Sequence, residues 1–163
     1  MNSVGVFVDV TNLYYCVGRK YDGRKLDYQK YLESIKSFGT ITRAIAYGTQ
    51  IEDEAISFIT CLRKLGYDTR YTPPKEIGGV KRLDWHSISL DIVRNIDRLD
   101  TVILGSSLSE YELLLDWIRE KGVRTIVLAC SISRELKDAS DQHIEITENL
   151  LESSEVNETV AAT

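Results

Sequence analysis

The residues best suited to chemistry in this sequence are carboxylates placed next to strand ends and helix starts. Asp9 follows the apolar run Val4–Val8, and Asn12 stands three residues later. Asp84 and Asp91 lie seven residues apart in one predicted helix, so that their carboxylates share a helix face, and Glu110 lies near the start of the next predicted helix. Oxygen ligands without His or Cys select Mg²⁺ or Mn²⁺, which bind one or two carboxylates together with substrate phosphate oxygens. A metal held in this way can activate water and stabilise displacement at phosphorus, so the pattern indicates phosphodiester hydrolysis.

Basic and aromatic side chains stand close to these acids in the sequence. Lys81 and Arg82 come just before Asp84, and we expect them to steer a phosphate. Arg24 and Lys25 end a segment that contains three tyrosines (Tyr14, Tyr15 and Tyr21). Proteins that bind single-stranded nucleic acid combine such residues, because the bases stack on aromatic rings while cations hold the backbone. A partly buried loop whose basic side chains extend into solvent explains the same composition.

Each candidate residue also has a purely structural explanation. Asp84 can cap the helix that it precedes, Asp91 can lie on a solvated helix face, and Glu110 can interact favourably with a helix dipole. Asn12 can form a turn. Asp9 is the most informative, because ligands bind beyond the carboxyl ends of strands in open α/β sheets.

Predicted strands and helices alternate along the chain. The strands are Val4–Val8, Ile41–Tyr47, Tyr67–Thr72, Thr101–Gly105, Arg124–Ala129 and a short edge strand at Ile144–Ile146. The helices are Asp27–Phe38, Glu52–Lys64, one that begins at Leu83 or Asp84 and ends at about Asn95, Ser109–Lys121 and Ser133–Asp138. This alternation predicts an α/β fold with a mostly parallel sheet of five or six strands and helices on both faces.

Two segments and one helix start are predicted less directly. We expect 12–25 to be a polar connection that contains at most a short helix, and Lys75–Val80, with Gly78-Gly79, to be a mobile loop. Ser109 followed by Glu112 is a capping-box pattern. In a parallel sheet, the carboxyl ends of the strands would bring Asp9, residues 73–80 and residues 105–110 to one edge.

The composition excludes several classes of protein. With 163 residues, of which 43% are hydrophobic and 28% charged, the chain is long enough for one domain with its own core. No apolar run approaches the roughly 20 residues of a membrane-spanning helix, and the start lacks signal-peptide character, so we expect a cytoplasmic protein without membrane association. Three separated cysteines favour free thiols. Dinucleotide-binding, P-loop and serine-hydrolase motifs are absent.

The charge is unevenly distributed. Six of the 25 acidic residues lie after Ser140, where there is no Lys or Arg, so the net charge of −5 arises in the last part of the chain. We expect one domain over residues 1–151 and a disordered acidic tail over 152–163.

Three motifs resemble the NYN domain family, in its LabA-like branch of the PIN-like nucleases. They are Asp9 to Leu13 (Asp-x-x-Asn-Leu), Lys81 to Asp84 with the later Asp91, and the apolar strand and acidic turn of Thr101 to Tyr111. The resemblance implies a three-layer, Rossmann-like sandwich, a bound Mg²⁺ or Mn²⁺, and cleavage of RNA. It assigns the metal to Asp9, Asp84 and Glu110, with Asp91 and Asn12 in support.

One of these motifs departs from the family pattern. The family usually has Ser-Gly-Asp-x-Asp-Phe after the fourth strand, whereas this chain has Ser106-Ser107-Leu108-Ser109-Glu110-Tyr111. Leu108 replaces the first aspartate, and Glu110 replaces the second. Two hypotheses follow. The chain is a metal-dependent ribonuclease that acts on single-stranded RNA, or it is a non-catalytic module that binds RNA, a protein partner or a second copy of itself.

Overall fold

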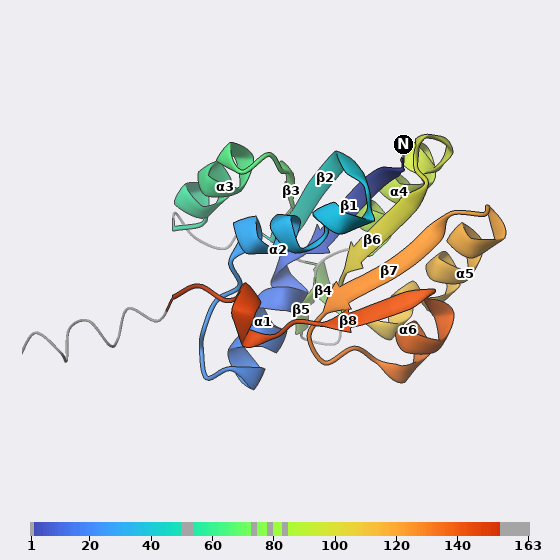
Figure 1. Cartoon of the computed structure of the whole chain (residues 1–163). Coiled ribbons are helices and arrows are strands. Elements are labelled where there is room, and N and C mark those ends of the chain that lie inside the picture. Colours follow the sequence, from blue (N-terminus) through green and yellow to red (C-terminus); the bar gives the residue numbers. More distant parts are fainter. Residues whose placement is uncertain (1, 50–53, 73–74, 78–79, 83–84, 154–163) are drawn as a thin grey trace, which may run out of the picture.

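A six-stranded, all-parallel sheet forms the centre of the molecule (Figure 1). The computed structural model describes residues 2–49, 54–72, 75–77, 80–82 and 85–153. In spatial order the strands are β3 (Asp68–Thr72), β2 (Thr40–Thr49), β1 (Ser3–Asp9), β6 (Thr101–Gly105), β7 (Arg124–Ala129) and β8 (Gln142–Glu145). The predicted α/β fold is therefore confirmed, with the larger of the two expected strand numbers.

Helices cover both faces of this sheet, as expected for right-handed crossovers between parallel strands. One face carries α2 (Tyr28–Ser34) and α3 (Glu54–Lys64), and the other carries α4 (Trp85–Asn95), α5 (Glu112–Glu120) and α6 (Arg134–Ala139) (Figure 1). The helix α1 (Val10–Lys20) begins directly at the end of β1. Short 3₁₀ turns follow or precede several elements: η1 (Lys36–Phe38), η2 (Ile96–Arg98), η3 (Ser109–Tyr111) and η4 (Glu148–Leu150).

The order of the strands reverses beside β1. The chain moves outward from β1 through β2 to β3, and then returns to the other side of β1 to form β6, β7 and β8. In the registers, Asp9 lies opposite Tyr47 of β2, and Val8 lies opposite Gly105 of β6. Parallel sheets bind ligands at the carboxyl ends of the strands that flank such a reversal. The fold therefore places Asp9 at the expected ligand-binding edge.

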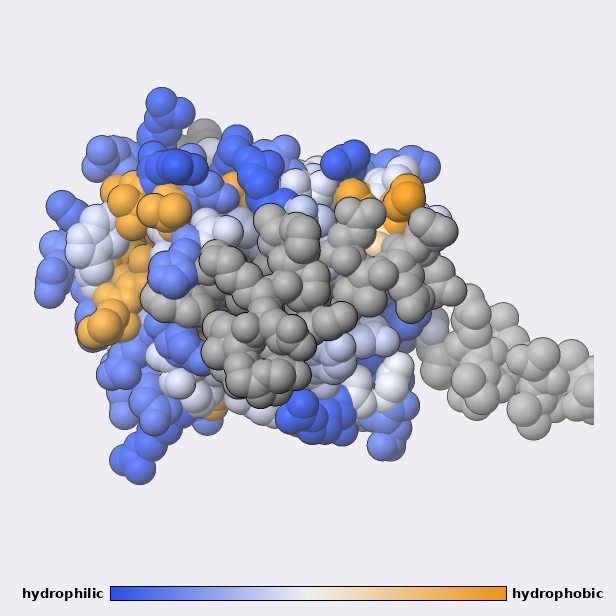
Figure 2. Space-filling view, turned by 180° about the vertical axis from the view of Figure 1, so that it is seen from behind, coloured by the Kyte–Doolittle hydropathy of each residue, from blue (hydrophilic) through white to orange (hydrophobic). Residues whose placement is uncertain are grey.

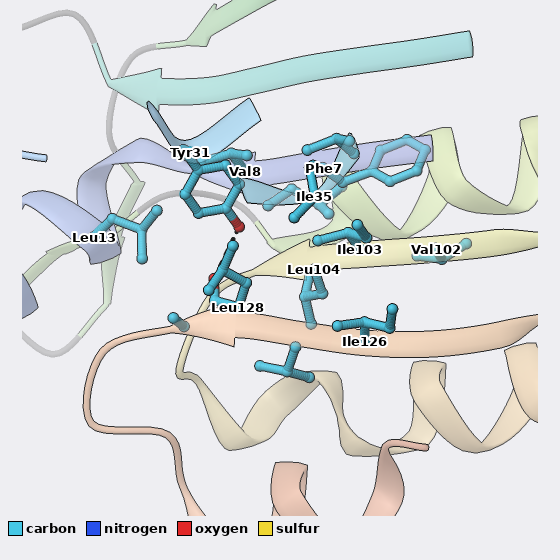
Figure 3. Packing of buried hydrophobic residues seen from close by; sticks show 14 of the residues in the cluster. Phe7, Val8, Leu13, Tyr31, Ile35, Val102, Ile103, Leu104, Ile126 and Leu128 are labelled. Carbon is cyan, nitrogen blue, oxygen red and sulfur yellow. Dashed lines mark hydrogen bonds between the residues drawn. The ribbon is translucent and has the colours of Figure 1, made fainter. Parts of the chain in front are cut away.

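The core is built on β1, which is buried from Val4 to Asp9. Figure 3 shows Tyr31 and Ile35, from α2 and the residue after it, packed over β1, β6 and β7. The hydroxyl of Tyr31 donates a hydrogen bond of 2.8 Å to the carbonyl of Leu128. A Cβ atom on Gly105 would lie 2.7 Å from the Tyr31 hydroxyl, so the absence of a side chain there lets the tyrosine approach β6.

Two segments differ from the sequence prediction. Residues 12–20, expected to lie in a polar connection with at most a short helix, belong to the eleven-residue helix α1. Val10, Leu13 and Val17 recur at helical spacing and are buried, which explains why this segment is helical. The predicted mobile loop Lys75–Val80 is also wrong, because β4 (Lys75–Ile77) and β5 (Val80–Arg82) form an antiparallel pair.

Two predicted helices are shorter than expected. The helix expected to run to Phe38 ends at Ser34, and η1 follows it. The helix expected from Ser109 begins at Glu112, after η3. No side-chain hydrogen bond caps the start of η3 or the start of α5. The predicted capping box is therefore not formed; the 3₁₀ turn instead buries the Tyr111 side chain completely.

The face that carries α4 and α5 exposes apolar side chains. Figure 2, which views the molecule from behind, shows apolar surface gathered at one side. Leu90 and Val93 of α4 are 53% and 44% exposed, and Leu113 of α5 is 81% exposed. In the part of the chain that the structure describes, no helix has the length and apolar character needed to cross a membrane. The three cysteines are free thiols, as predicted.

Candidate functional site

Asp9 is the centre of the candidate site. It is the last residue of β1 and also the N-cap of α1, because its Oδ1 accepts a 3.0 Å hydrogen bond from the backbone N–H of Asn12. Its Oδ2 accepts a longer bond of 3.5 Å from the hydroxyl of Ser106, which follows β6. Asp9 is 1% exposed. The Asp9 carboxylate thus links the carboxyl end of β1 to that of β6, the two strands beside which the strand order reverses.

Burial changes the acidity of this carboxylate. Loss of hydration raises the pKa of Asp9 from 3.8 to about 6, and the hydrogen bonds from Asn12 and Ser106 lower it in part. Among the side chains that the structure describes, no Lys, Arg or His lies within 4.0 Å of Asp9. A buried carboxylate is normally compensated by an opposite charge. In the described structure, hydrogen bonds alone compensate this one.

Asn12 links α1 to the segment after β6. Its Oδ1 accepts hydrogen bonds from the backbone N–H and the hydroxyl of Ser107, at 3.0 and 3.1 Å. Its Nδ2 lies 3.6 Å from Cys16 Sγ, and that sulfur is 3.4 Å from the Ser107 hydroxyl. Asn12 therefore lies beside Asp9, and its side-chain oxygen holds Ser107 in place.

The other predicted metal ligands lie in different settings. Glu110 is exposed in η3. Asp91 is hydrogen bonded to the hydroxyl of Tyr47 at 2.8 Å, and it lies 4.0 Å from Arg70 and 3.7 Å from Arg94. Two cations and a phenol therefore surround Asp91. Asp84 lies outside the described residues.

The chemistry of the donors fits a hard cation only in part. Among the described residues, no group of three His, Cys, Asp or Glu side chains is close enough to hold a metal ion. Carboxylate, amide and hydroxyl oxygens of Asp9, Asn12, Ser106 and Ser107 do gather at one edge. Oxygen donors of this kind are those that Mg²⁺ and Mn²⁺ accept.

The predicted basic residues divide into two groups. Lys81 and Arg82 are in β5, and their side chains are not among those described. Arg24 and Lys25 line a cavity of about 480 Å³ at the carboxyl ends of β1, β2 and β3. Its aromatic lining residues are Tyr14, Tyr15, Tyr28, Phe58 and Tyr71, and we call it the aromatic cavity. It adjoins the candidate site, because Val10 and Thr11, which follow Asp9, also line it.

Several residues of this edge were not assigned from the sequence. In the sequence, Ser106 and Ser107 stand out only as part of the motif that contains Leu108, whereas in the structure they donate to Asp9 and Asn12. Their position directly after a buried strand was the available signal. Tyr71 lies in a predicted strand and Phe58 in a predicted helix; only strand order, which a single sequence leaves open, brings them beside α1.

The six-stranded parallel sheet with helices on both faces defines an α/β, Rossmann-like sandwich, consistent with a PIN-like fold. The family model described as the NYN domain matches residues 3–150, so the chain belongs to the NYN domain family. A crystal structure of a Vibrio parahaemolyticus protein of unknown function is similar, with a TM-score of 0.84 and 24% identity over 93% of this chain and 96% of that chain. That likeness shows the fold alone. The search of curated proteins found no match.

Proposed function

We propose that this NYN-domain protein is a ribonuclease that requires Mg²⁺ or Mn²⁺ and cleaves single-stranded RNA at the edge that holds Asp9. One observation carries the proposal. Asp9 is a buried carboxylate at the sheet reversal, and the described side chains around it provide hydrogen-bond donors but no cation. A divalent cation would supply the missing positive charge.

Each residue of the edge has a distinct part in this proposal. Asp9 would hold the metal, with Asp84 and Glu110 as the further ligands that the family pattern implies. The bound metal would supply a nucleophilic water and charge stabilisation at phosphorus. Asn12 positions Ser107 and the start of α1 around the carboxylate. Lys81 and Arg82 would attract the phosphate, and Asp91 would support the site from α4.

The test is cleavage of end-labelled single-stranded RNA by the pure protein in Mn²⁺, in Mg²⁺ and in EDTA. We expect cleavage that depends on the metal and falls to the EDTA level in Asp9→Asn. Asp97→Asn is the matched control, since Asp97 is an exposed acid in η2, which precedes the amino end of β6. Cleavage that persists in EDTA, or that survives in Asp9→Asn, contradicts the proposal.

A second candidate function is a non-catalytic interaction module. Leu108 favours it, because it replaces a carboxylate of the family motif, and so do the exposed Leu90, Val93 and Leu113 on α4 and α5. Exposed apolar surface on adjoining elements is a common mark of protein–protein contact. If no metal supports cleavage while the protein still binds RNA or a second copy, this candidate replaces the first. The LabA-like branch and a cytoplasmic location stay predictions of the sequence.

A further inference from the structure

The aromatic cavity has the size and the aromatic lining expected of a site that binds a planar ligand. Its volume of about 480 Å³ lies within the range of small-molecule sites, roughly 300–1,000 Å³. Tyr28 and Phe58 meet edge to face in its wall, with ring centroids 5.6 Å apart. Tyr14 and Tyr15 also line it, and they are 58% and 54% exposed. Exposed tyrosines at the mouth of a cavity provide faces on which a flat ring can stack.

Gly48 makes room for a further wall of the cavity. Gly48 of β2 lies opposite Tyr71 of β3 in the register. A Cβ atom on Gly48 would lie 2.5 Å from Tyr71 Cε1, so the tyrosine ring packs directly against the bare backbone of β2. Both residues line the cavity. A side chain at position 48 would push the ring from its place.

Two polar atoms of the cavity residues lack hydrogen-bond partners. They are Tyr71 Oη and Arg24 Nε, which are buried and make no hydrogen bond within the described part of the chain. Leaving such a buried atom without a partner is unfavourable, so a ligand that accepts a hydrogen bond from it gains binding energy. Both atoms can donate, and the nitrogen and carbonyl edges of a nucleobase accept hydrogen bonds.

The charges at the cavity suit a nucleotide with its phosphate outside. Arg24 and Lys25 line the cavity, and a guanidinium nitrogen of Arg24 donates to the Glu152 carbonyl at 3.2 Å. The same guanidinium lies 3.9 Å from the Glu148 carboxylate, and Glu152 also lines the cavity, so the positive charge is partly offset. The cavity therefore favours a ring that stacks and accepts hydrogen bonds over a bare anion.

We propose that the aromatic cavity binds one nucleobase of a single-stranded RNA, so that a neighbouring phosphate of the same strand lies at Asp9. Val10 and Thr11 connect the two places directly, since they follow Asp9 and line the cavity. The identity of the strand as RNA rests on the proposed function. The base is recognised by stacking on tyrosine and by the free hydrogen-bonding atoms of Tyr71 and Arg24.

The test is binding in EDTA, where cleavage plays no part. A fluorescein-labelled single-stranded RNA is titrated with the full chain, and a second oligonucleotide carries 2-aminopurine, whose fluorescence falls when it stacks on an aromatic ring. We expect both signals in the wild type and a loss of affinity of about tenfold or more in the double variant Tyr14→Ala/Tyr15→Ala. Both tyrosines are exposed, so this variant keeps the core intact.

A paired set of conservative variants separates the cavity from general effects. Tyr71→Phe removes only the unpartnered hydroxyl, and we expect it to weaken binding several-fold. Tyr21→Phe is the matched control, because the Tyr21 hydroxyl donates to the Ile146 carbonyl and Tyr21 is not among the described residues that line the cavity. Equal affinity of wild type, Tyr71→Phe and the double variant for the oligonucleotide overturns the proposal.

An oligonucleotide series with a single abasic site at each position shows whether a base is recognised. One abasic position should weaken binding to the wild type, and it should weaken binding to Tyr14→Ala/Tyr15→Ala far less. Equal binding of intact and abasic strands, or binding of free mononucleotides but not of the oligonucleotide, overturns the proposal. If binding depends on a base but no metal supports cleavage, the cavity proposal holds and the ribonuclease proposal is refuted. If the protein cleaves RNA but binding does not depend on a base, the ribonuclease proposal holds and the cavity proposal is refuted.

Discussion

At the scale of single residues, buried Asp9 makes the free energy of unfolding depend on pH. Its pKa of about 6 in the folded protein exceeds 3.8, so the folded state binds the proton more tightly than the unfolded state does. The resulting stabilisation is present below pH 4 and is lost as the pH rises to about 6 and above. The cost of ionising buried Asp9 then reaches about 3 kcal/mol.

Asp9→Asn should therefore raise stability above pH 6 while it removes the proposed metal ligand. The amide oxygen still accepts the hydrogen bond from the Asn12 N–H, so the cap of α1 survives. The measurement is the unfolding free energy of both proteins by urea titration from pH 4 to pH 8 without metal. The advantage of the variant should grow with pH by up to about 3 kcal/mol. A difference that is the same at all pH values would show that Asp9 titrates normally.

The same carboxylate predicts proton release on metal binding. At pH 6 about half of the Asp9 side chains carry a proton, and a divalent cation must displace it in order to bind. Calorimetric titration with Mn²⁺ in two buffers of different ionisation enthalpy should detect about half a proton released per metal at pH 6 and almost none at pH 8. No change in proton release between these pH values would rule out Asp9 as the titrating ligand.

Leu108 allows the family motif to be restored. It follows Ser106 by two residues, and its backbone N–H donates to the Ser106 hydroxyl that contacts Asp9. Leu108→Asp should tighten Mn²⁺ binding about tenfold or more by adding a carboxylate at this edge. Leu108→Asn is the control, because an asparagine has nearly the volume of an aspartate but carries no charge. If the two variants bind Mn²⁺ alike, the added charge does not reach the metal site.

At the scale of elements, two glycines should respond to alanine with opposite signs. Gly105 of β6 has no room for a methyl group, because a Cβ there would lie 2.7 Å from the Tyr31 hydroxyl and 3.2 Å from Val8 Cα. Gly18 lies in α1, and the nearest atom to an added Cβ is 4.0 Å away. We expect Gly105→Ala to lower stability by about 1–3 kcal/mol, and Gly18→Ala to raise it by about 0.5–1 kcal/mol.

Thermal unfolding of the two alanine variants measures this contrast. For a chain of this length, 1 kcal/mol corresponds to about 2–4 °C in Tm. Adding Tyr31→Phe to Gly105→Ala tests the cause, since it removes the hydroxyl that the methyl group would displace. The double variant should be less destabilised than the sum of the two single variants. Strict additivity would mean that the methyl group clashes with Val8 of β1 and not with the tyrosine hydroxyl.

The success of sequence-based prediction at this scale depended on how local the signal was. β6 and β7 were predicted with the observed bounds, because short apolar strands buried on both faces need no partner to be recognised. α1 was underestimated, because its polar and aromatic residues obscured the buried Val10, Leu13 and Val17. The β4–β5 pair was missed although Gly78-Gly79 between two short segments is a hairpin signal.

The residues of the candidate site also differ in whether a local sequence signal could predict them. Asp9 and Asn12 were predicted from one continuous motif, and they lie together. Ser106, Ser107 and the aromatic cavity depend on which strands are neighbours, and strand order is a property of the whole sheet. Tyr47 and Arg70 contact Asp91 from β2 and β3. These partners of Asp91 could not be predicted without knowing the order of the strands.

At the scale of the whole molecule, the last described residues close the fold and one wall of the aromatic cavity. Leu151 is 1% exposed and pairs with Leu26, and hydrogen bonds of 2.8 Å join Asp27 to Leu150 and Glu152 to Lys25. These contacts hold the segment before α2 against residues 150–152. The cavity residues Arg24, Lys25 and Leu26 therefore depend on a part of the chain more than 120 residues away.

Truncation tests this dependence and the predicted domain boundary together. A chain that ends at Ser153 keeps all of these contacts and should have the Tm of the full chain. A chain that ends at Thr147 loses buried Leu151 and both hydrogen bonds, which should cost about 3 kcal/mol or more and lower the Tm by about 6 °C or more. It should also bind RNA more weakly, because Arg24 and Lys25 lose their support. If the chain that ends at Ser153 is itself destabilised, residues after 153 contribute to the fold and the predicted boundary at 151 is wrong.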